Sequence, residues 1–346
     1  MTPRPAPQDL LPWALSVLGG SATAAALPLS AVAGDASARR YFRFSSGGRS
    51  YIAADAPPAT QKNEEFVRVA GLLAAAGVTV PSLLGVDLER GFLLLEDLGD
   101  RLLLSALDAD SADSHYHHAF DILAKMAAVR PDHTGLGEYD RSLLTEELSR
   151  FSQWFVHGLL DHVPTGAEEN LLNNLYSQLI DSALEQPRVL VHRDFHSRNL
   201  MLVGQDELAV IDFQDAVIGP VTYDLVSLLR DCYIQWPVAS VQAWARDYHS
   251  LLRSRGVLNE VDAAQFLRWF DWVGLQRHLK VLGTFARLYL RDGKPGYLAD
   301  LPLVIHYVLE IVDKYASEER FFADFGAWFR SCLGPLIELQ AWSKTA

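Results

Sequence analysis

Apolar and polar positions in the first hundred residues alternate in a way that predicts strands around one helix. The segment RRYFRFSSGGRSYIAADA (39–56) alternates with period two and turns at Ser45–Gly48, which is typical of a β-hairpin. Residues 61–77 carry apolar side chains at helical spacing and end at a glycine. Two further strands are expected within 78–87 and 91–100. This order predicts a small α+β lobe built on an antiparallel sheet.

Beyond residue 105 the apolar positions recur with a helical period, and one region interrupts them. There VLVH runs into a polar loop, and NLMLV, GQDE and LAVIDF then predict a strand, a turn and a strand. We therefore predict an α+β, bilobal fold, with an antiparallel-sheet N-lobe over 1–100 and a larger, mainly helical C-lobe over 101–346. Helices are expected near 113–130, 141–160, 167–185, 222–233, 238–255, 260–291, 298–316 and 318–333.

Residues 189–202, VLVHRDFHSRNLML, form an apolar run that is interrupted by seven charged or polar side chains within eight positions. These side chains cannot contribute to an apolar core, so we expect them to serve a function other than stability. Asp194 lies two residues after His192, Asn199 lies five residues after Asp194, and Asp212 follows one hairpin later. The spacing matches the H-R-D-x-x-x-x-N pattern of a kinase catalytic loop, and an Asp-Phe pair stands where kinases carry Asp-Phe-Gly. We expect the side chains of Asp194, Asn199 and Asp212 to lie together at the opening of one site.

The same segments resemble a known family. HRDFHSRN followed by IDFQDAVIGPVTYDL is similar to the aminoglycoside-phosphotransferase-like branch of the protein-kinase-like fold. GDASARRYFRF, DAPP, IDFQDAVIGPVTYDLVSLLRDCY and LQRHLKVLG resemble the bacterial anomeric sugar kinases of cell-wall recycling, which phosphorylate N-acetylmuramate and N-acetylglucosamine at the C1 hydroxyl. The resemblance runs from about Gly34 to about Leu301 and implies ATP and Mg²⁺ as cofactors, with the catalytic loop and acceptor pocket in the C-lobe.

The chemistry of phosphoryl transfer suits the residue types in this pattern. Mg²⁺ prefers oxygen ligands, which the amide of Asn199 and the carboxylate of Asp212 would supply. Asp194 is placed to accept the proton of a sugar hydroxyl and to aim it. His192 is expected to brace the loop, and Asp224 to cap a helix or anchor the loop.

Several further residues are candidates for substrate contacts. His196 either touches substrate or supports the loop, and Arg198, like Arg193, contacts phosphate or pairs with a loop carboxylate such as Asp215. Gln214 and Asp215 are candidates for hydrogen bonds to the sugar. The expected helix at 260–291 carries Gln276, Arg277, Lys280 and Arg287. These four are either a solvated face beside a core stripe or a basic wall suited to the carboxylate of a muramic acid.

The nucleotide contacts are expected in the N-lobe. LLLEDLG (93–99) resembles an inter-lobe hinge, where the backbone of Glu96, Asp97 and Leu98 would meet the adenine edge. GDASARR (34–40) stands where a phosphate-covering loop belongs, but it lacks G-x-G-x-x-G, and the chain holds no G-x-x-x-x-G-K-[ST].

The small-lobe lysine that kinases use for the α- and β-phosphates is absent from its strand, which reads YIAADAPP. We predict Arg43 as its substitute. Arg39, Arg40 and Lys62 are the rivals, and Lys62 is the only lysine in the first hundred residues. The partner on the helix is expected to be Glu64 or Glu65; of these we select Glu65.

The composition of the chain indicates which classes of binding partner and which cellular compartment to expect. The chain has 346 residues, 49% of them hydrophobic, and a formal net charge of -13, which disfavours a nucleic acid or an anionic membrane as a partner. Cys232 and Cys332 are too few for a disulfide framework, so we expect reduced core thiols. A monomer in the cytoplasm is expected.

The N-terminus carries LLPWALSVLGGSATAAALPLSAVAG, which resembles a signal peptide with an AVA site. Asp9 and several Pro and Gly residues favour instead a short amphipathic helix that begins near Asp9 and ends at Gly19 and Gly20. No apolar run free of such breakers reaches the roughly 20 residues of a membrane span.

Three other functions fit parts of the pattern. A kinase of an aminoglycoside or another small alcohol or amine would keep the fold and change the acceptor. A metallohydrolase could use His192, Asp194 and His196 as ligands, but this leaves Asn199 unexplained. A non-catalytic kinase-like binding module would account for the missing lysine, but not for the retention of Asp194, Asn199 and Asp212 together.

Overall fold

The structure is a computed structural model that describes residues 5–19, 27–32, 39–204 and 207–344. It divides into two compact units. The first comprises Met1–Asp108 with Arg198–Ala216, and the second comprises Ala109–Ser197 with Val217–Ala346. The predicted lobes, 1–100 and 101–346, differ from this division mainly in the segment 198–216, which packs with the first unit.

A five-stranded antiparallel sheet in the order β1-β2-β3-β5-β4 forms the centre of the first unit. The hairpin of β2 and β3 and the helix α2 lie where the sequence predicts them, and β4 is shorter than expected because its first residues include Pro81. The elements are α1 (Leu10–Val17), β1 (Ser30–Val32), β2 (Arg40–Ser46), β3 (Arg49–Asp55), α2 (Asn63–Ala75), β4 (Leu83–Asp87), β5 (Phe92–Glu96) and a 3₁₀ turn, η1 (Leu103–Ala106).

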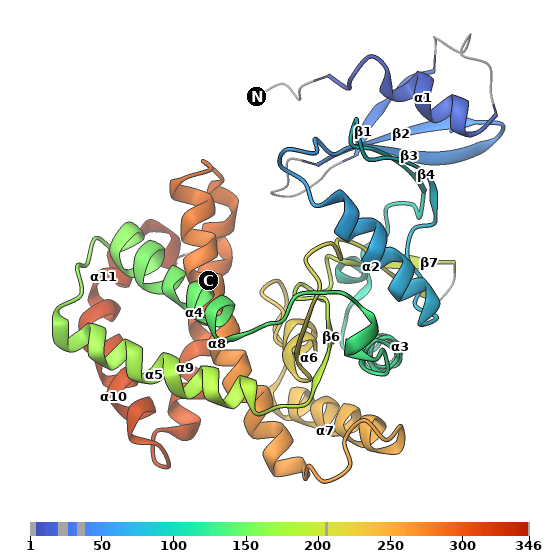
Figure 1. Cartoon of the computed structure of the whole chain (residues 1–346). Helices are drawn as coiled ribbons and strands as arrows, with labels where there is room; N and C mark the ends of the chain where they lie inside the picture. The colour runs from blue at the N-terminus through green and yellow to red at the C-terminus, as the bar shows by residue number, and fades with distance from the viewer. Residues whose placement is uncertain (1–4, 20–26, 33–38, 205–206, 345–346) are drawn as a thin grey trace. The chain divides into compact units, whose positions relative to one another are not determined.

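The N-terminal helix α1 is part of the packing of this unit (Figure 1). Leu10, Ala14 and Leu15 are buried on the sheet together with Phe42 and Phe92. Strand β1 pairs with β2 and extends the sheet. The prediction of a short amphipathic helix is therefore confirmed for Leu10–Val17.

The hairpin of β7 (Leu200–Val203) and β8 (Glu207–Val210) joins the first unit through its backbone. The N–H of Leu202 donates to the carbonyl of Arg101 at 2.8 Å, and the N–H of Val210 donates to the carbonyl of Thr79 at 2.9 Å. The rings of Phe66 and Phe213 stack with centroids 4.7 Å apart. These long-range bonds explain why the contiguous boundary expected from the sequence missed this segment.

The second unit is mainly helical, and its long helix α8 (Ala263–Leu290) packs against most of the others (Figure 1). Gly283 allows α8 to approach another helix closely, because a Cβ there would lie 2.2 Å from the backbone of Arg150. The other elements are α3 (Ala112–Ala127), η2 (Pro131–His133), α4 (Arg141–Arg150), η3 (Phe151–Leu159), α5 (Gly166–Leu184), β6 (Arg188–Val191), β9 (Val217–Pro220), α6 (Tyr223–Leu229), α7 (Val238–Ser254), η4 (Pro295–Asp300), α9 (Leu301–Tyr315), α10 (Arg320–Trp328), η5 (Phe329–Leu333), α11 (Gly334–Glu338) and η6 (Ala341–Lys344).

Two of the predicted helices change their winding. The helix expected over 141–160 becomes π-helical in η3, and the helix expected over 318–333 ends in the π-helical η5. A π-turn inserts an extra residue per turn, so the apolar period alone did not reveal it. Strand β9, which pairs with β6, was also not predicted.

One described stretch, Pro295–Tyr315, is long and apolar enough to cross a membrane by length and composition alone, with 33% of its window buried. It contains Pro302, and its α-helical part is α9. The buried residues Leu301, Val304 and Val308 recur at helical spacing, and α9 packs against α8. That pattern is also typical of a core helix.

Candidate active site

The catalytic-loop segment of the second unit is fixed by two buried carboxylates. Asp224 accepts the backbone N–H of His192 at 2.6 Å and that of Arg193 at 3.0 Å. Asp231 accepts the N–H of Ser197 at 2.9 Å. Asp224 is thus a loop anchor, as the sequence predicts. His192 is also the expected brace, because its Nδ1 accepts the N–H of Asp194 at 3.3 Å.

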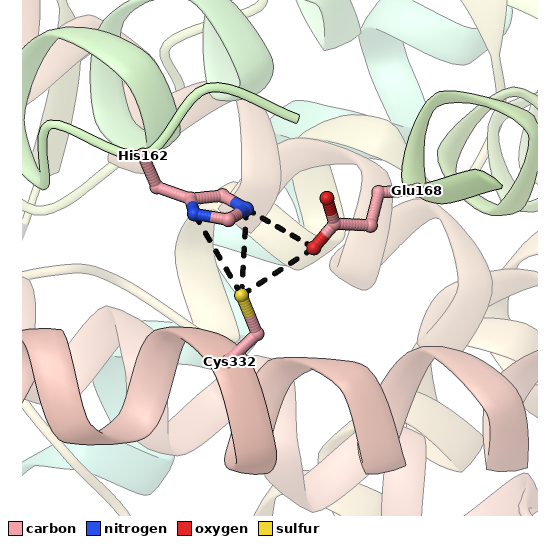
Figure 2. Close-up of side chains that lie close together, drawn as sticks. All are labelled: His162, Glu168 and Cys332. Carbon is pink, nitrogen blue, oxygen red and sulfur yellow. Dashed lines mark hydrogen bonds and ion pairs between the residues drawn. The ribbon is translucent and has the colours of Figure 1, made fainter. Parts of the chain in front are cut away.

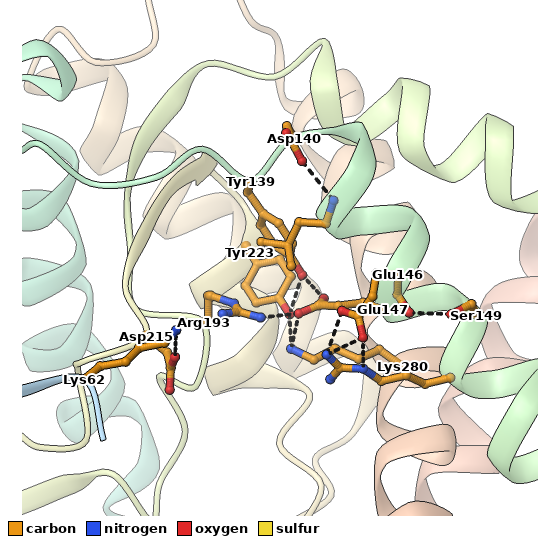
Figure 3. A network of polar contacts seen from close by, with 12 residues as sticks. Lys62, Tyr139, Asp140, Glu146, Glu147, Ser149, Arg193, Asp215, Tyr223 and Lys280 are labelled. Carbon is orange, nitrogen blue, oxygen red and sulfur yellow. Dashed lines mark hydrogen bonds and ion pairs between the residues drawn. The ribbon is translucent and has the colours of Figure 1, made fainter. Parts of the chain in front are cut away.

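Arg193 adopts a strained backbone and its side chain turns inward. Its φ is +77°, a region that non-glycine residues rarely occupy and that clusters at functional sites. Its guanidinium forms an ion pair with Glu147 of α4, whose side chain is fully buried. Asp215, the loop carboxylate suggested as a partner, pairs with Lys62 at 2.7 Å (Figure 3). Arg193 thus pairs with a carboxylate, but this carboxylate lies on a helix and not in a loop.

Asp194 is surrounded by cationic side chains of its own unit. Burial raises the pKa of its carboxyl, but the positive charges of Lys280, Arg277 and Arg193 outweigh this and bring the pKa below its ordinary value. Asp194 is therefore ionised at neutral pH. A carboxylate in this state can only accept a proton, which is the role the sequence predicts.

A buried polar network surrounds Glu147 (Figure 3). Lys280 Nζ lies 3.2 Å from Glu147 Oε1 and donates to the hydroxyl of Tyr223 at 3.0 Å. The hydroxyl of Tyr139 donates to Glu147 Oε2. Burial raises the pKa of Glu147, yet the charges of Lys280 and Arg193 outweigh it and keep the pKa low. Glu147 was not a sequence candidate, because on a helix with an adjacent Glu146 it looks like a solvated residue.

Three of the four candidate polar residues of α8 are buried, so the interpretation of a solvated face is wrong for these three. Gln276, Arg277 and Lys280 are 0%, 3% and 8% exposed. Arg277 donates to Cys232 Sγ at 3.7 Å. His196 lies close by, since it and Asp194 each shift the pKa of the other, and its buried Nδ1 has no hydrogen-bond partner among the described residues. The structure thus brings Arg277, Lys280 and His196 together around Asp194.

In the first unit, the β7–β8 hairpin brings Asn199 and Asp212 to the same end. Leu200 pairs with Val210, and the N–H of Ile211 donates to the carbonyl of Asn199 at 3.0 Å. Asp212 has a φ of +65°, a second strained position. An amide and an exposed carboxylate at one hairpin end are a suitable donor set for Mg²⁺. Arg198, the residue before Asn199, is at the same end.

A buried arginine also reaches this end of the hairpin. Arg39 donates to Gln214 Oε1 at 3.1 Å and to Asn63 Oδ1 at 3.3 Å. Gln214 in turn donates from Nε2 to Asp212 Oδ1 at 2.9 Å. The guanidinium of Arg39 lies over the ring of Phe66, 4.5 Å from its centroid. Arg39 is therefore fixed beside Asp212.

The predicted pair of Arg43 and Glu65 is not brought together. Arg43 donates to Asp97 at 2.6 Å and to Asp100 at 2.8 Å, while Glu65 is exposed. The buried arginine-to-α2 contact is that of Arg39 with Asn63. The alternation of a strand could not distinguish the two arginines, because positions 39 and 43 are an even number of residues apart and are expected on the same face of the sheet. The available signal was the polar Asn63 among the apolar positions of α2.

The predicted hinge follows β5 directly. Glu96 accepts from Ser82 Oγ at 2.7 Å, and Asp97 accepts from Arg43 and from Ser50. Among the described residues, the backbone groups of Leu98 take no part in a backbone hydrogen bond. The expected phosphate-covering loop, GDASARR, lies outside the described residues except for its two arginines.

The Asp224 anchor predicts a pH dependence of stability. Burial raises its pKa from 3.8 to about 6, so the folded chain holds a proton that the unfolded chain releases between these values. Relative to Asp224→Asn, the free energy of unfolding of the wild type falls by up to about 3 kcal/mol from pH 4 to pH 6.5. Urea unfolding of both proteins across this range measures it. A constant difference would contradict the assignment.

The comparisons with known proteins agree with this geometry. Residues 28–273 match the model of a family described as "Phosphotransferase enzyme family". The chain belongs to this family. Membership supports an enzyme that transfers a phosphoryl group, and it argues against the metallohydrolase and the non-catalytic module.

Two curated relatives cover most of the phosphotransferase chain. The N-acetylmuramate/N-acetylglucosamine kinase of Pseudomonas putida is 44% identical over 286 residues, which is 83% of this chain and 84% of the relative. The protein of the same name from Pseudomonas aeruginosa is 45% identical over 278 residues, 79% of this chain and 80% of the relative.

The fold is shared with a solved aminoglycoside phosphotransferase, a thermostable mutant in a ternary complex with ADP and hygromycin B. The TM-score is 0.56 at 17% identity, over 88% of this chain and 98% of that one. The predicted fold class is thereby confirmed: this phosphotransferase has the α+β, protein-kinase-like fold with an antiparallel sheet and a mainly helical remainder.

Proposed function

We propose that the protein is an ATP-dependent sugar kinase that transfers the γ-phosphoryl group to the anomeric hydroxyl of N-acetylmuramate and N-acetylglucosamine. The names and the high identity of the curated relatives support the acceptor. The observation that carries the proposal is the carboxylate of Asp194 beside the buried cations Arg277 and Lys280. A cationic wall attracts the carboxylate of N-acetylmuramate and repels a polycationic aminoglycoside, which weakens that alternative.

In this reaction Asp194 accepts a hydrogen bond from the anomeric hydroxyl and aims its oxygen at the γ-phosphorus. The new O–P bond forms as the bond between the γ-phosphorus and the β,γ-bridging oxygen breaks, and ADP leaves. The hydroxyl proton passes to Asp194. Because the transition state is loose, aim contributes more than basicity, and the low pKa of Asp194 is compatible with the role.

The nucleotide and its ion are assigned to residues of the first unit. Asn199 and Asp212 would hold Mg²⁺, which neutralises charge on the transferred phosphoryl group when bound. The hinge of Glu96, Asp97 and Leu98 would contact adenine. For the phosphates we now favour Arg39 over Arg43, because Arg39 shares Gln214 with Asp212 whereas the charge of Arg43 is already neutralised by two aspartates.

The remaining candidates are assigned to the acceptor and the phosphates. Arg277, Lys280 and His196 would line the acceptor site, with Arg277 or Lys280 meeting the lactyl carboxylate. Arg198, Gln214 and Asp215 would contact phosphate or sugar. We further propose that the enzyme works as a cytoplasmic monomer in peptidoglycan recycling, without a nucleic-acid or membrane partner.

An acceptor panel tests the function. We expect phosphate transfer from Mg-ATP to N-acetylmuramate and N-acetylglucosamine and none to kanamycin or choline, with the product identified as the sugar 1-phosphate. Arg277→Gln should lower kcat/KM about tenfold more for N-acetylmuramate than for N-acetylglucosamine, because only the former carries a carboxylate. Turnover of kanamycin alone, or of no acceptor, would overturn the proposal.

The phosphate contact is tested by paired arginine variants. Arg39→Ala is expected to raise KM for ATP about tenfold, while Arg43→Ala changes it no more than about twofold. Arg39→Lys should recover part of the loss, since it restores the charge without the forked geometry. Steady-state kinetics at varied ATP measure this, with circular dichroism as the control for folding. The reverse ranking of the two alanine variants would assign the contact to Arg43.

A further inference from the structure

A histidine, a carboxylate and a thiol converge in the second unit at a place that the kinase reaction does not use. His162 follows the π-helix η3, Glu168 lies in the first turn of α5, and Cys332 lies in η5 (Figure 2). Their ligand atoms all lie within 4.8 Å of one another. Cys332 is half-buried rather than a core thiol, so the expectation from the sequence is wrong for this residue.

The spacing of the three atoms is that of a metal coordination sphere. His162 Nε2 lies 3.0 Å from Glu168 Oε1, and Cys332 Sγ lies 3.4 Å from each of these two atoms. A tetrahedral Zn²⁺ with bonds of about 2.0–2.3 Å holds such ligand atoms about 3.3–3.6 Å apart. Cys332 Sγ also lies 3.8 Å from His162 Nδ1, so the imidazole would turn to aim its Nε2 lone pair at the ion as the three ligand atoms move outward by a few tenths of an ångström.

The backbone around the cluster is unusual in a way that presents these side chains. Asp161, just before His162, has a φ of +54° and is a non-glycine residue. Cys332 lies in η5, and η3 and η5 are both π-helical. π-Segments and strained positions are costly and occur frequently at functional sites. Here the strained Asp161 and the two π-helical segments all lie next to, or contain, residues of the same cluster.

Glu168 is held in an orientation that leaves one oxygen for the cluster. Its Oε2 accepts the N–H of Thr165 at 2.7 Å in a capping box, and its Oε1 accepts from Trp328 Nε1 at 2.7 Å. The hydrogen bond from Thr165 lowers the pKa of Glu168 to about 2, so it is ionised at neutral pH. Metal-binding carboxylates are typically oriented by such outer hydrogen bonds.

We propose that His162, Glu168 and Cys332 form a site for a borderline transition-metal ion such as Zn²⁺, separate from the kinase site. Three protein ligands of mixed N, O and S type leave a fourth position for water. The bound ion would link the end of η3, the start of α5 and η5. On binding, the Cys332 thiol gives its proton to solvent as the S–metal bond forms, and no oxidation state changes.

Co²⁺ is the probe that reports on a thiolate ligand. The full chain, treated with a chelator and desalted, is titrated with Co²⁺ and then with Zn²⁺, without nucleotide. We expect one Co²⁺ per chain, a thiolate-to-metal absorption band in the near ultraviolet, displacement by Zn²⁺, and a higher Tm with Zn²⁺. Cys332→Ser should abolish the band, and His162→Ala and Glu168→Gln should weaken binding at least tenfold.

Matched controls separate this site from adventitious binding. His157→Ala and Glu169→Gln remove exposed groups near the same segments and should leave the titration unchanged. If folded Cys332→Ser binds as tightly as the wild type, or the wild type shows no thiolate band, the proposal is wrong. Kinase activity should survive His162→Ala, so failure of the metal site and failure of the proposed kinase function give different results.

Discussion

Replacing Asp194 with asparagine should lower kcat for sugar phosphorylation by about 10³-fold, within the range expected for loss of a positioned proton acceptor. The neutral amide holds the acceptor hydroxyl in line less strongly than the carboxylate does, and it cannot take the proton. KM for ATP should change little, because the nucleotide contacts are assigned to other residues. Steady-state kinetics with N-acetylmuramate measure both parameters.

The same substitution also has a cost in stability that must be measured separately. Lys280 and Arg277 are buried beside Asp194, and a neutral amide leaves their charge less compensated. We expect a loss of about 1–3 kcal/mol in the free energy of unfolding. Asp132→Asn changes the same group at an exposed position and should alter neither activity nor stability. Full activity of folded Asp194→Asn would refute the assignment of the base.

The catalytic-loop residues were predictable because their relations are local in sequence. Asp194 and Asn199 lie on one short segment, and the β7–β8 hairpin that leads to Asp212 is announced by its own apolar pattern. The anchor Asp224 could be inferred from its place at a helix start. Such features depend on the backbone conformation of a few neighbouring residues, which can be predicted from the local sequence pattern.

Other features depend on distant packing and could not be predicted. The helical period of α8 indicates a buried stripe, but it does not tell whether Arg277 and Lys280 point into it; that depends on the close approach of α4, which Gly283 permits. Likewise, Arg39 and Arg43 share one parity on the chain. Only Asn63 and Gln214, brought in from elsewhere in the unit, distinguish them.

Glu147 is the clearest example of a residue whose role depends on distant packing, and its replacement by glutamine should be strongly destabilising. The carboxylate is fully buried and compensates both Arg193 and Lys280. Removing its charge leaves the buried Lys280 and the largely buried Arg193 with one acceptor fewer, which costs about 3–5 kcal/mol. Urea unfolding at pH 7 measures the loss.

The neighbouring residue gives the matched control. Glu146 is exposed and pairs with Arg150 at 2.8 Å, so Glu146→Gln should cost less than about 1 kcal/mol. Because Arg193 precedes Asp194 and Lys280 acts on its charge, Glu147→Gln should also lower kcat at temperatures where it stays folded. Equal stability of the two glutamine variants would mean that the network carries no net stabilisation. A stability loss with unchanged kcat would separate it from catalysis and restrict Glu147 to holding α4 against α8.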